Sequence, residues 1–205
     1  RDLAIINQLQ LESLEVFSGS SAIEFFHKNK IEAQDVYSPP RFDVKDGKLE
    51  KSLRWLWSYY KYYKHCKEVS SEIIDKEKPK LIISDEDFAS VAIAQKKKIP
   101  NIIITDILET KFTTGFGGII EKKMNKIMCE MLDKANKVII PELGENQNNI
   151  VRTGPIVRKI QKNRGEIRNI LDFKKKTIVL SVGGTDAGIF LIKQTIEAVK
   201  KIQID

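Results

Sequence analysis

Two short apolar runs rich in β-branched residues, separated by one helix-length segment, constrain this sequence more than any other feature. The runs are LIIS at 81–84 and NIIIT at 101–105. Each is apolar at consecutive positions, as is typical of a strand covered on both faces of a parallel sheet. Between the runs, one face of a helix is predicted by the spacing of Phe88, Val91, Ala92 and Gln95. The segment 79–106 therefore predicts a β-α-β unit, and the chain an α/β fold with a parallel sheet and flanking helices.

Polar residues follow both predicted strands directly. The first strand is followed by Asp85, Glu86 and Asp87 after Ser84, and the second by Asp106 after Thr105. In parallel α/β sheets, ligands bind beyond the carboxyl ends of the strands. We therefore expect these residues at the edge of a cleft. Asp85 and Asp87 are the candidate catalytic residues, and Ser84 and Asp106 are candidate substrate-binding residues.

A purely structural role is the alternative for the two candidate catalytic carboxylates. Ser84, with Asp87 three positions later, resembles a capping box at the start of the predicted helix. Asp85 and Asp87 would then only favour the positive end of that helix, an effect of roughly 0.3–1 kcal/mol. The sequence leaves both alternatives open.

The longest predicted helix spans 51–78 and carries two lines of aromatic residues. Its predicted core stripe comprises Leu53, Leu56, Tyr60, Tyr63, Cys66, Val69 and Ile73. A second line lies beside the basic residues Arg54, Lys61 and Lys64 and comprises Trp55, Tyr59 and Tyr62. Exposed aromatic and basic side chains together favour contact with an anionic membrane surface. A second core contact with a neighbouring element is the equal alternative.

Composition limits the classes of partner and compartment. The chain has 41% hydrophobic and 31% charged residues, and its +7 net charge favours anionic partners. The charge is spread over many helices, so we do not expect nucleic-acid binding. The two cysteines, Cys66 and Cys129, stand in no metal-binding spacing. We therefore expect reduced thiols in a cytoplasmic protein, and neither a metal nor a cofactor.

The C-terminal part of the chain predicts a second β-strand, turn and helix. The Gly154-Pro155 step marks a predicted boundary between domains at 1–153 and 154–205. Beyond it, TIVLSV at 177–182 predicts a buried parallel strand. Gly183, Gly184 and Thr185 follow, where the amino end of the next helix could bind a phosphate. A simple structural turn is the alternative.

The order of these segments resembles glycosyltransferases of the GT-B fold, specifically family 28 and its archaeal relatives. That family includes the lipid-linked N-acetylglucosaminyltransferase of peptidoglycan synthesis. Three segments carry the resemblance: KPKLIISDEDFASVAIAQKKKIPNIIITD is similar to the acceptor-side β-α-β unit, RTGPIVRK to the linker, and SVGGTDAG to the start of the donor domain. The resemblance implies a Rossmann-like acceptor domain lacking its first strand and glycine loop, followed by an incomplete nucleotide-sugar domain. Of the segment around that loop, Arg1 at the first helix is what remains.

The resemblance implies an inverting, metal-independent transfer of a sugar, expected from a UDP-sugar, to a glycan or lipid-linked acceptor. Gly183, Gly184 and Thr185 would bind the donor diphosphate, while Asp85 and Asp87 would bind acceptor hydroxyls or, for one of them, remove the acceptor proton. Further candidate substrate-binding residues are Arg1 and, in the glycine-rich loop, Thr113, Gly115 and Gly117. The protein would be cytoplasmic, either free or peripheral on the cytoplasmic face of the membrane. The alternatives are a UDP-sugar hydrolase and a non-catalytic subunit that recruits an acceptor or a membrane.

Overall fold

A computed structural model describes residues 1–9, 13–41, 44–45, 48–49, 52–111, 115–182 and 187–201. The chain divides into two compact units. The first comprises Arg1–Pro40 and Leu53–Arg158, and the second comprises Arg41–Ser52 and Lys159–Asp205. The predicted boundary between residues 153 and 154 stays a prediction.

The first unit contains a four-stranded parallel sheet. Its strands lie in the order of the sequence: β5 (Ile82–Asp85), β6 (Asn101–Ile104), β7 (Lys137–Ile140) and β8 (Ile150–Arg152). In the register of β5 and β6, Asp85 lies opposite Ile104. The carboxyl ends of the two strands therefore stop at the same edge, and the predicted α/β fold with a parallel sheet is confirmed.

Two helices pack against this sheet and enclose the core. They are α4 (Phe88–Lys96) and α5 (Phe116–Lys134). Their inward side chains meet those of β6 and β7 in a cluster that comprises Val91, Ile103, Met128, Met131, Leu132, Ala135, Val138 and Ile140. Val91, Ile103 and Val138 have no exposed surface. The apolar run of β6 thus helps to fill this interior, whereas Leu81 and Ile83 of the first run are 42% and 36% exposed, so the expected cover on both faces was wrong there.

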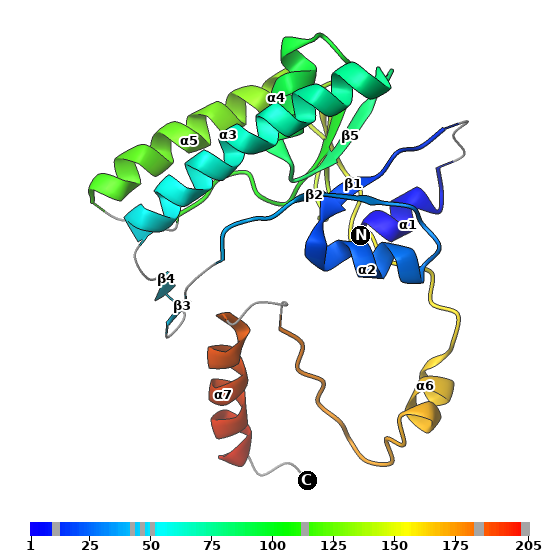
Figure 1. Ribbon diagram of the computed structural model, residues 1–205. Helices are drawn as coiled ribbons and strands as arrows, with labels where there is room; N and C mark the ends of the chain where they lie inside the picture. The colour runs from blue at the N-terminus through cyan, green and yellow to red at the C-terminus, as the bar shows by residue number, and fades with distance from the viewer. Residues whose placement is uncertain are drawn as a thin grey trace. The chain divides into compact units, whose positions relative to one another are not determined.

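Helix α3 (Ser52–Glu77) is the longest helix described, and Figure 1 shows it beside α4 and α5. An ion pair of 2.5 Å between Asp75 and Lys97 ties it to the residue that ends α4. Its buried positions are Leu56, Cys66, Ser70 and Ile74. The predicted core stripe was wrong at two positions, because Leu53 and Tyr60 are 54% and 56% exposed.

The other elements of the first unit precede α3. They are α1 (Asp2–Ile6), β1 (Phe17–Gly19), α2 (Ser20–Lys28) and β2 (Gln34–Tyr37). Strands β1 and β2 pair in parallel. A Cβ atom on Gly19 would lie 2.8 Å from the carbonyl oxygen of Tyr37. This close pairing therefore requires glycine, and it places Tyr37 at the end of β2.

The described part of the second unit contains short strands and two helices. These elements are β3 (Val44–Lys45), β4 (Lys48–Leu49), α6 (Arg164–Ile170) and α7 (Ala187–Lys200). Strands β3 and β4 form an antiparallel pair. The predicted strand at 177–182 was wrong, because this segment has no strand structure and Val179 is 75% exposed. Among the described strands none pairs with it, so its backbone lacks the partner that a strand needs.

Candidate functional site

Polar side chains gather where β5 and β6 end, as the sequence predicts. Asp85 is the last residue of β5, and the amide of Glu86 donates a hydrogen bond to the carbonyl oxygen of Ile104 in β6 at 3.1 Å. Glu86 has φ of +59°, the left-handed region that non-glycine residues rarely occupy. Such backbone strain costs on the order of 1–3 kcal/mol and is concentrated at functional sites. Glu86 thus has a strained backbone at the edge where the polar side chains gather.

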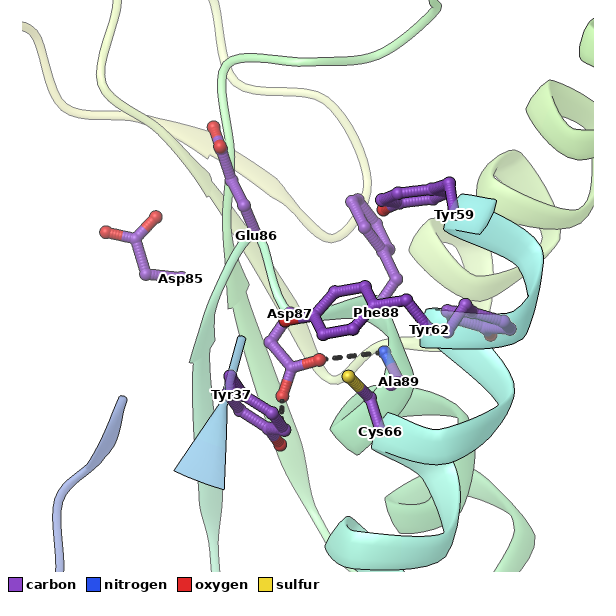
Figure 2. Close-up of a pocket in the computed structure, with 10 residues that line it drawn as sticks. Tyr37, Tyr59, Tyr62, Cys66, Asp85, Glu86, Asp87, Phe88 and Ala89 are labelled. Atoms are coloured by element: carbon purple, nitrogen blue, oxygen red, sulfur yellow. Dashed lines mark hydrogen bonds between the residues drawn. The ribbon is translucent and has the colours of Figure 1, made fainter. Parts of the chain in front are cut away.

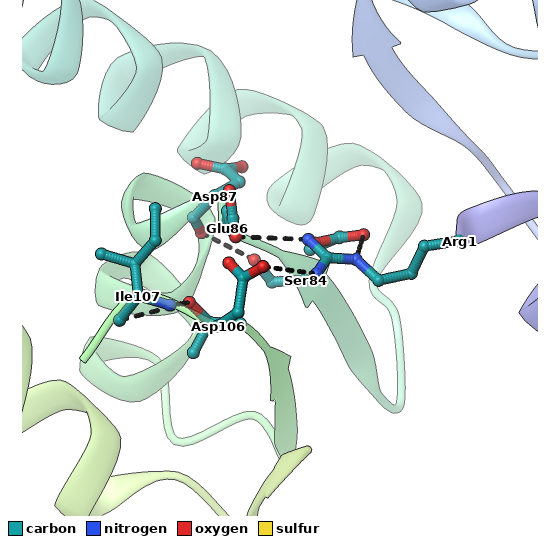
Figure 3. A network of polar contacts seen from close by, with 8 residues as sticks. Arg1, Ser84, Glu86, Asp87, Asp106 and Ile107 are labelled. Atoms are coloured by element: carbon teal, nitrogen blue, oxygen red, sulfur yellow. Dashed lines mark hydrogen bonds and ion pairs between the residues drawn. The ribbon is translucent and has the colours of Figure 1, made fainter. Parts of the chain in front are cut away.

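The guanidinium group of Arg1 links the carboxylates at this edge (Figure 3). Its Nε donates to Asp85 Oδ2 at 2.7 Å, and its Nη2 donates to the other oxygen of Asp85 as well. Nη2 also donates to Glu86 Oε1 at 3.2 Å, while Nη1 lies 3.9 Å from Asp106 Oδ2. The structure therefore brings together three residues that the sequence predicted separately, namely Arg1, Asp85 and Asp106. Fork-like pairing with both oxygens of Asp85 fixes the geometry of that carboxylate.

One cation does not neutralise this many acids, and the pKa of two carboxyl groups near it is raised. Burial is the main reason why the pKa of Asp2 is raised to about 7. Asp85 acts in the same direction, both through a hydrogen bond and through its negative charge. Burial also raises the pKa of Glu86, together with a hydrogen bond to Asp106. The same hydrogen bond with Glu86 lowers the pKa of Asp106. The hydrogen bond thus favours a proton on Glu86 over one on Asp106, and a raised pKa at a cleft edge suits an acid or base catalyst.

Asp87 has the structural role that the sequence left open. It is the N-cap of α4, where its Oδ1 accepts from the amides of Ala89 and Ser90 at 3.0 and 3.3 Å. Its Oδ2 accepts from the hydroxyl of Tyr37 at 2.9 Å. The predicted capping box with Ser84 at the helix start was wrong. Ser84 lies within β5, buried and paired with the sheet, so the helix begins after Asp87, and the Ser84 hydroxyl instead donates to the carbonyl oxygen of Asp87 at 2.8 Å.

A cavity of about 150 Å³ lies beside these carboxylates, between α3 and the turn that follows β5 (Figure 2). Aromatic rings form much of its lining: Tyr37, Tyr59, Tyr62, Tyr63 and Phe88. Cys66, Ala89 and the three acids that follow Ser84 complete it. Burial raises the pKa of Tyr37, Tyr59 and Tyr62, and that of Tyr63 to about 12. The four hydroxyls are therefore neutral at physiological pH.

The predicted membrane-facing line of α3 lies largely at this cavity. Tyr59 and Tyr62 line it, and Trp55 stacks on Tyr59 with ring centroids 5.1 Å apart. Trp55, Tyr59 and Tyr62 are half-buried, which favours the alternative of a second contact with a neighbouring element, and their membrane-facing role stays a prediction. The physical reason is the rotation of α3, which turns Ser70 toward Tyr37, where their hydroxyls are hydrogen bonded at 3.0 Å.

The aromatic residues that α3 does expose lie on another face. Trp57 is 60% exposed and Tyr60 is 56% exposed, and their rings stack with centroids 5.8 Å apart. The ammonium group of Lys61 lies 5.4 Å from the Trp57 ring centroid, within reach of a cation–π interaction. Among the helices that the structure describes, none has the length and apolar character needed to span a bilayer.

The remaining predicted site residues divide into two groups. Gly115 is the N-cap of α5 with φ of +61°, a conformation that favours glycine, and Gly117 is buried in the first turn. Their role in substrate binding stays a prediction. Thr113, Gly183, Gly184 and Thr185 lie outside the described residues. Within the described ranges, no group of three or more His, Cys, Asp or Glu side chains is arranged to hold a metal ion.

The sequence did not single out several residues of the site. Tyr37 and Tyr63 carry no motif, and Asp2 gives no sign that it contacts Asp85. Glu86 stood among the acids after the first strand, yet its chemistry depends on its contact with Asp106. Its position at a strand end was the available signal, whereas the tyrosines could be placed only by the packing of β2 and α3.

Comparison with solved structures finds distant similarity only. Neither a protein-family model nor a curated protein sequence matches the chain. A crystal structure of MurG from Acinetobacter baumannii is similar, with a TM-score of 0.42 and 13% sequence identity. The similarity covers 78% of this chain and 42% of the MurG chain, so the chain spans less than half the length of that protein. Membership of family 28 stays a prediction.

Proposed function

We propose that the chain is the acceptor-side part of a glycosyltransferase, which moves a sugar from a nucleotide sugar, namely a UDP-sugar, to an acceptor hydroxyl. One observation carries this proposal. A carboxyl group with a raised pKa, Glu86, stands beside a cavity at the carboxyl edge of a parallel sheet. That is where ligands of such sheets bind, and the sequence pattern of this edge resembles family 28.

Glu86 is the proposed general base, in place of Asp87. As the acceptor oxygen forms its bond to the anomeric carbon, the acceptor proton passes to Glu86. The bond from the anomeric carbon to the phosphate oxygen breaks, and its electron pair leaves with the nucleoside diphosphate. A raised pKa lets a carboxylate take this proton more readily than an ordinary one at neutral pH. Attack opposite the leaving group inverts the configuration and requires no metal in this scheme.

The neighbouring charges are proposed to position the acceptor. Asp85 is held by two hydrogen bonds from Arg1 and can accept a hydrogen bond from a second acceptor hydroxyl. Asp106 accepts a hydrogen bond from Glu86 when Glu86 is protonated, which contributes to the raised pKa of the proposed base. Asp87 holds α4 and Tyr37 in place, which makes it a positioning residue. Backbone N–H groups of Gly183, Gly184 and Thr185 are proposed for the donor diphosphate.

A membrane-associated acceptor is favoured by the exposed face of α3. Trp57, Tyr60 and Lys61 form a small aromatic and basic patch there. Such side chains suit the headgroup region of an anionic bilayer. We therefore propose that this patch, and not Trp55, Tyr59 and Tyr62, makes the membrane contact on the cytoplasmic face. The same patch would serve the alternative of a recruiting subunit that has no activity of its own.

UDP release by the full-length protein from a panel of UDP-sugars, with and without a lipid extract, tests the proposal. Release that requires the extract supports a transferase, and the labelled lipid then identifies the acceptor. Release without an acceptor indicates a hydrolase instead. Absence of release in both conditions contradicts an enzyme that uses UDP-sugars and favours the recruiting subunit.

Replacement of the proposed base sharpens this test. Glu86→Gln should lower the turnover by about 100-fold or more, the typical contribution of a general base. The exposed acid Glu72 on α3 provides the matched control, and Glu72→Gln should leave turnover unchanged. A pH profile of kcat/KM should show an acid limb above the ordinary pKa of a glutamate. If Glu86→Gln turns over at the normal rate, Glu86 is not the base.

A further inference from the structure

We propose that the tyrosine-lined cavity, defined by Tyr37, Tyr59, Tyr62, Tyr63 and Phe88, binds an alkylated ammonium group carried by a ligand. The cavity combines neutral aromatic rings with acids and offers no lysine or arginine among its lining residues. Rings with adjacent carboxylates are the chemistry that recognises organic cations.

The charge of the lining excludes the anionic part of a nucleotide sugar. The ionisable acids of the lining are Asp85, Glu86 and Asp87. The guanidinium group of Arg1 compensates one of these charges, while Asp106 adds another acid nearby. A diphosphate or carboxylate placed here would meet like charge in a partly desolvated space, whereas a cation would be attracted.

The aromatic rings are arranged so that a cation can lie among them. The rings of Tyr59 and Tyr62 have centroids 6.2 Å apart and are inclined by 52°, so they do not stack face to face. Tyr37 is held by Ser70 and Asp87, which fixes its ring. A cation within about 6 Å of a ring centroid is attracted by the negative face of that ring.

The carboxylates supply mainly charge, because each of their oxygens already accepts a hydrogen bond and few acceptor sites remain for a ligand. Both oxygens of Asp87 accept from the protein, and so do both oxygens of Asp85. A primary ammonium group loses its hydration on entry and needs three acceptors in return. An alkylated ammonium group has fewer N–H groups or none, so it loses fewer hydrogen bonds to water when it enters the cavity. This difference selects the alkylated cation.

The volume of the cavity fits one head group. A space of about 150 Å³ corresponds to about five water molecules at their share of liquid volume. Whole small-molecule ligands fill cavities of about 300–1,000 Å³. The cavity therefore takes the cationic end of a larger ligand. The assignment of that ligand as the sugar acceptor rests on the proposed function, but cation binding itself does not.

Calorimetric titration of the full-length protein with choline tests the inference. The neutral isostere 3,3-dimethylbutan-1-ol has the same shape without the charge, and we expect it to bind at least tenfold more weakly. Phosphocholine should also bind more weakly than choline, because its phosphate meets the acids of the lining. Equal binding of choline and its isostere overturns the proposal, and so does tighter binding of phosphocholine.

Variants on one helix localise the site. Tyr62→Leu removes a ring of the cavity and should weaken choline binding by about tenfold. Tyr60→Leu removes an exposed ring of the same helix and should change the affinity for choline by less than twofold. Tyr62→Phe keeps the ring, preserves folding and should retain binding. Loss of affinity in Tyr60→Leu equal to that in Tyr62→Leu contradicts the site.

The choline-binding experiment tests this inference separately from the UDP-release assay. UDP release with no choline binding removes this inference and leaves the proposed transferase. Choline binding without UDP release keeps the cation site and removes the transferase.

Discussion

Two segments of this chain share one local pattern, yet only one of them forms a strand. Residues 81–96 and 177–200 each consist of an apolar run, a short turn and a helix. The first run lies in β5, paired along its length with β6. The second run remains irregular, and its Ile178 is 65% exposed.

The difference teaches that an apolar run becomes a parallel strand only when a neighbouring strand completes its hydrogen bonds. Strand β5 has β6 beside it, and β6 has β7 on its other side. The helices α4 and α5 then cover the same strands. The segment 177–182 has helix α7 after it, but no described strand pairs with it. Local pattern supplies the apolar residues, whereas pairing decides their conformation.

The largest expected effect comes from removing core volume in the paired segment. Ile103→Ala should lower the free energy of unfolding of the first unit by about 2–5 kcal/mol, because the side chain is fully buried and leaves a cavity. Val179→Ala, in the unpaired segment, should change it by less than about 0.5 kcal/mol. Urea unfolding followed by circular dichroism measures both.

A large effect of Val179→Ala on the free energy of unfolding would contradict the distinction between a paired and an unpaired segment. It would mean that residues 177–182 pack against a partner in solution, as the sequence pattern predicted. Equal and small effects for both variants would instead contradict the core assigned to β6.

A smaller effect is expected at the helix caps of the two units. Asp87→Ala should destabilise the first unit by about 1–2 kcal/mol, because it removes the oxygen that accepts from two helix amides and the oxygen that accepts from the Tyr37 hydroxyl. Asn163→Ala removes the capping box of the exposed helix α6 and should cost about 0.5 kcal/mol.

Conservative replacement controls this prediction. Asp87→Asn keeps an oxygen for the cap and should cost less than Asp87→Ala. Thermal unfolding compares the variants. If Asp87→Ala is no more destabilising than Asn163→Ala, the cap and the Tyr37 contact do not stabilise the paired segment.

The smallest effect is a dependence of stability on pH at the edge of the sheet. The pKa of Asp2 is raised in the folded state to about 7 from an ordinary value of 3.8. The folded protein therefore binds more protons than the unfolded chain between these values, so stability falls as pH rises through about 7. The raised pKa of Glu86 also makes stability fall with rising pH, whereas the lowered pKa of Asp106 has the opposite effect.

Asp2→Asn should reduce this fall, since an amide neither binds nor releases the proton. At pH 8 the variant should be more stable than the parent by on the order of 1 kcal/mol, after allowance for solvent screening. Urea midpoints at pH 5 and pH 8 measure the change. An unchanged pH dependence in the variant would show that Asp2 is not the group that titrates.

The position of the site in the fold could largely be predicted from the sequence, but the roles of its individual residues could not. The pattern at 79–106 placed Asp85, Asp106 and Ser84 at the carboxyl edge, and the structure confirms that location. It could not separate a catalytic Asp87 from a capping one, because both require an acid at the same position. The cavity depends on Tyr37 and on residues of α3, which lie far from this edge in sequence.

The sequence by itself determined the β-α-β unit, because consecutive β-branched residues and helical spacing are local properties of the chain. Only the tertiary structure decided which face of α3 is buried, which acid has a raised pKa and whether residues 177–182 form a strand. Each of these depends on a partner distant in sequence: Tyr37 and Ser70 orient the helix, a hydrogen bond with Asp106 raises the pKa of Glu86, and a strand requires a neighbour. Such contacts are absent from any local pattern, since packing brings them together only when the chain folds.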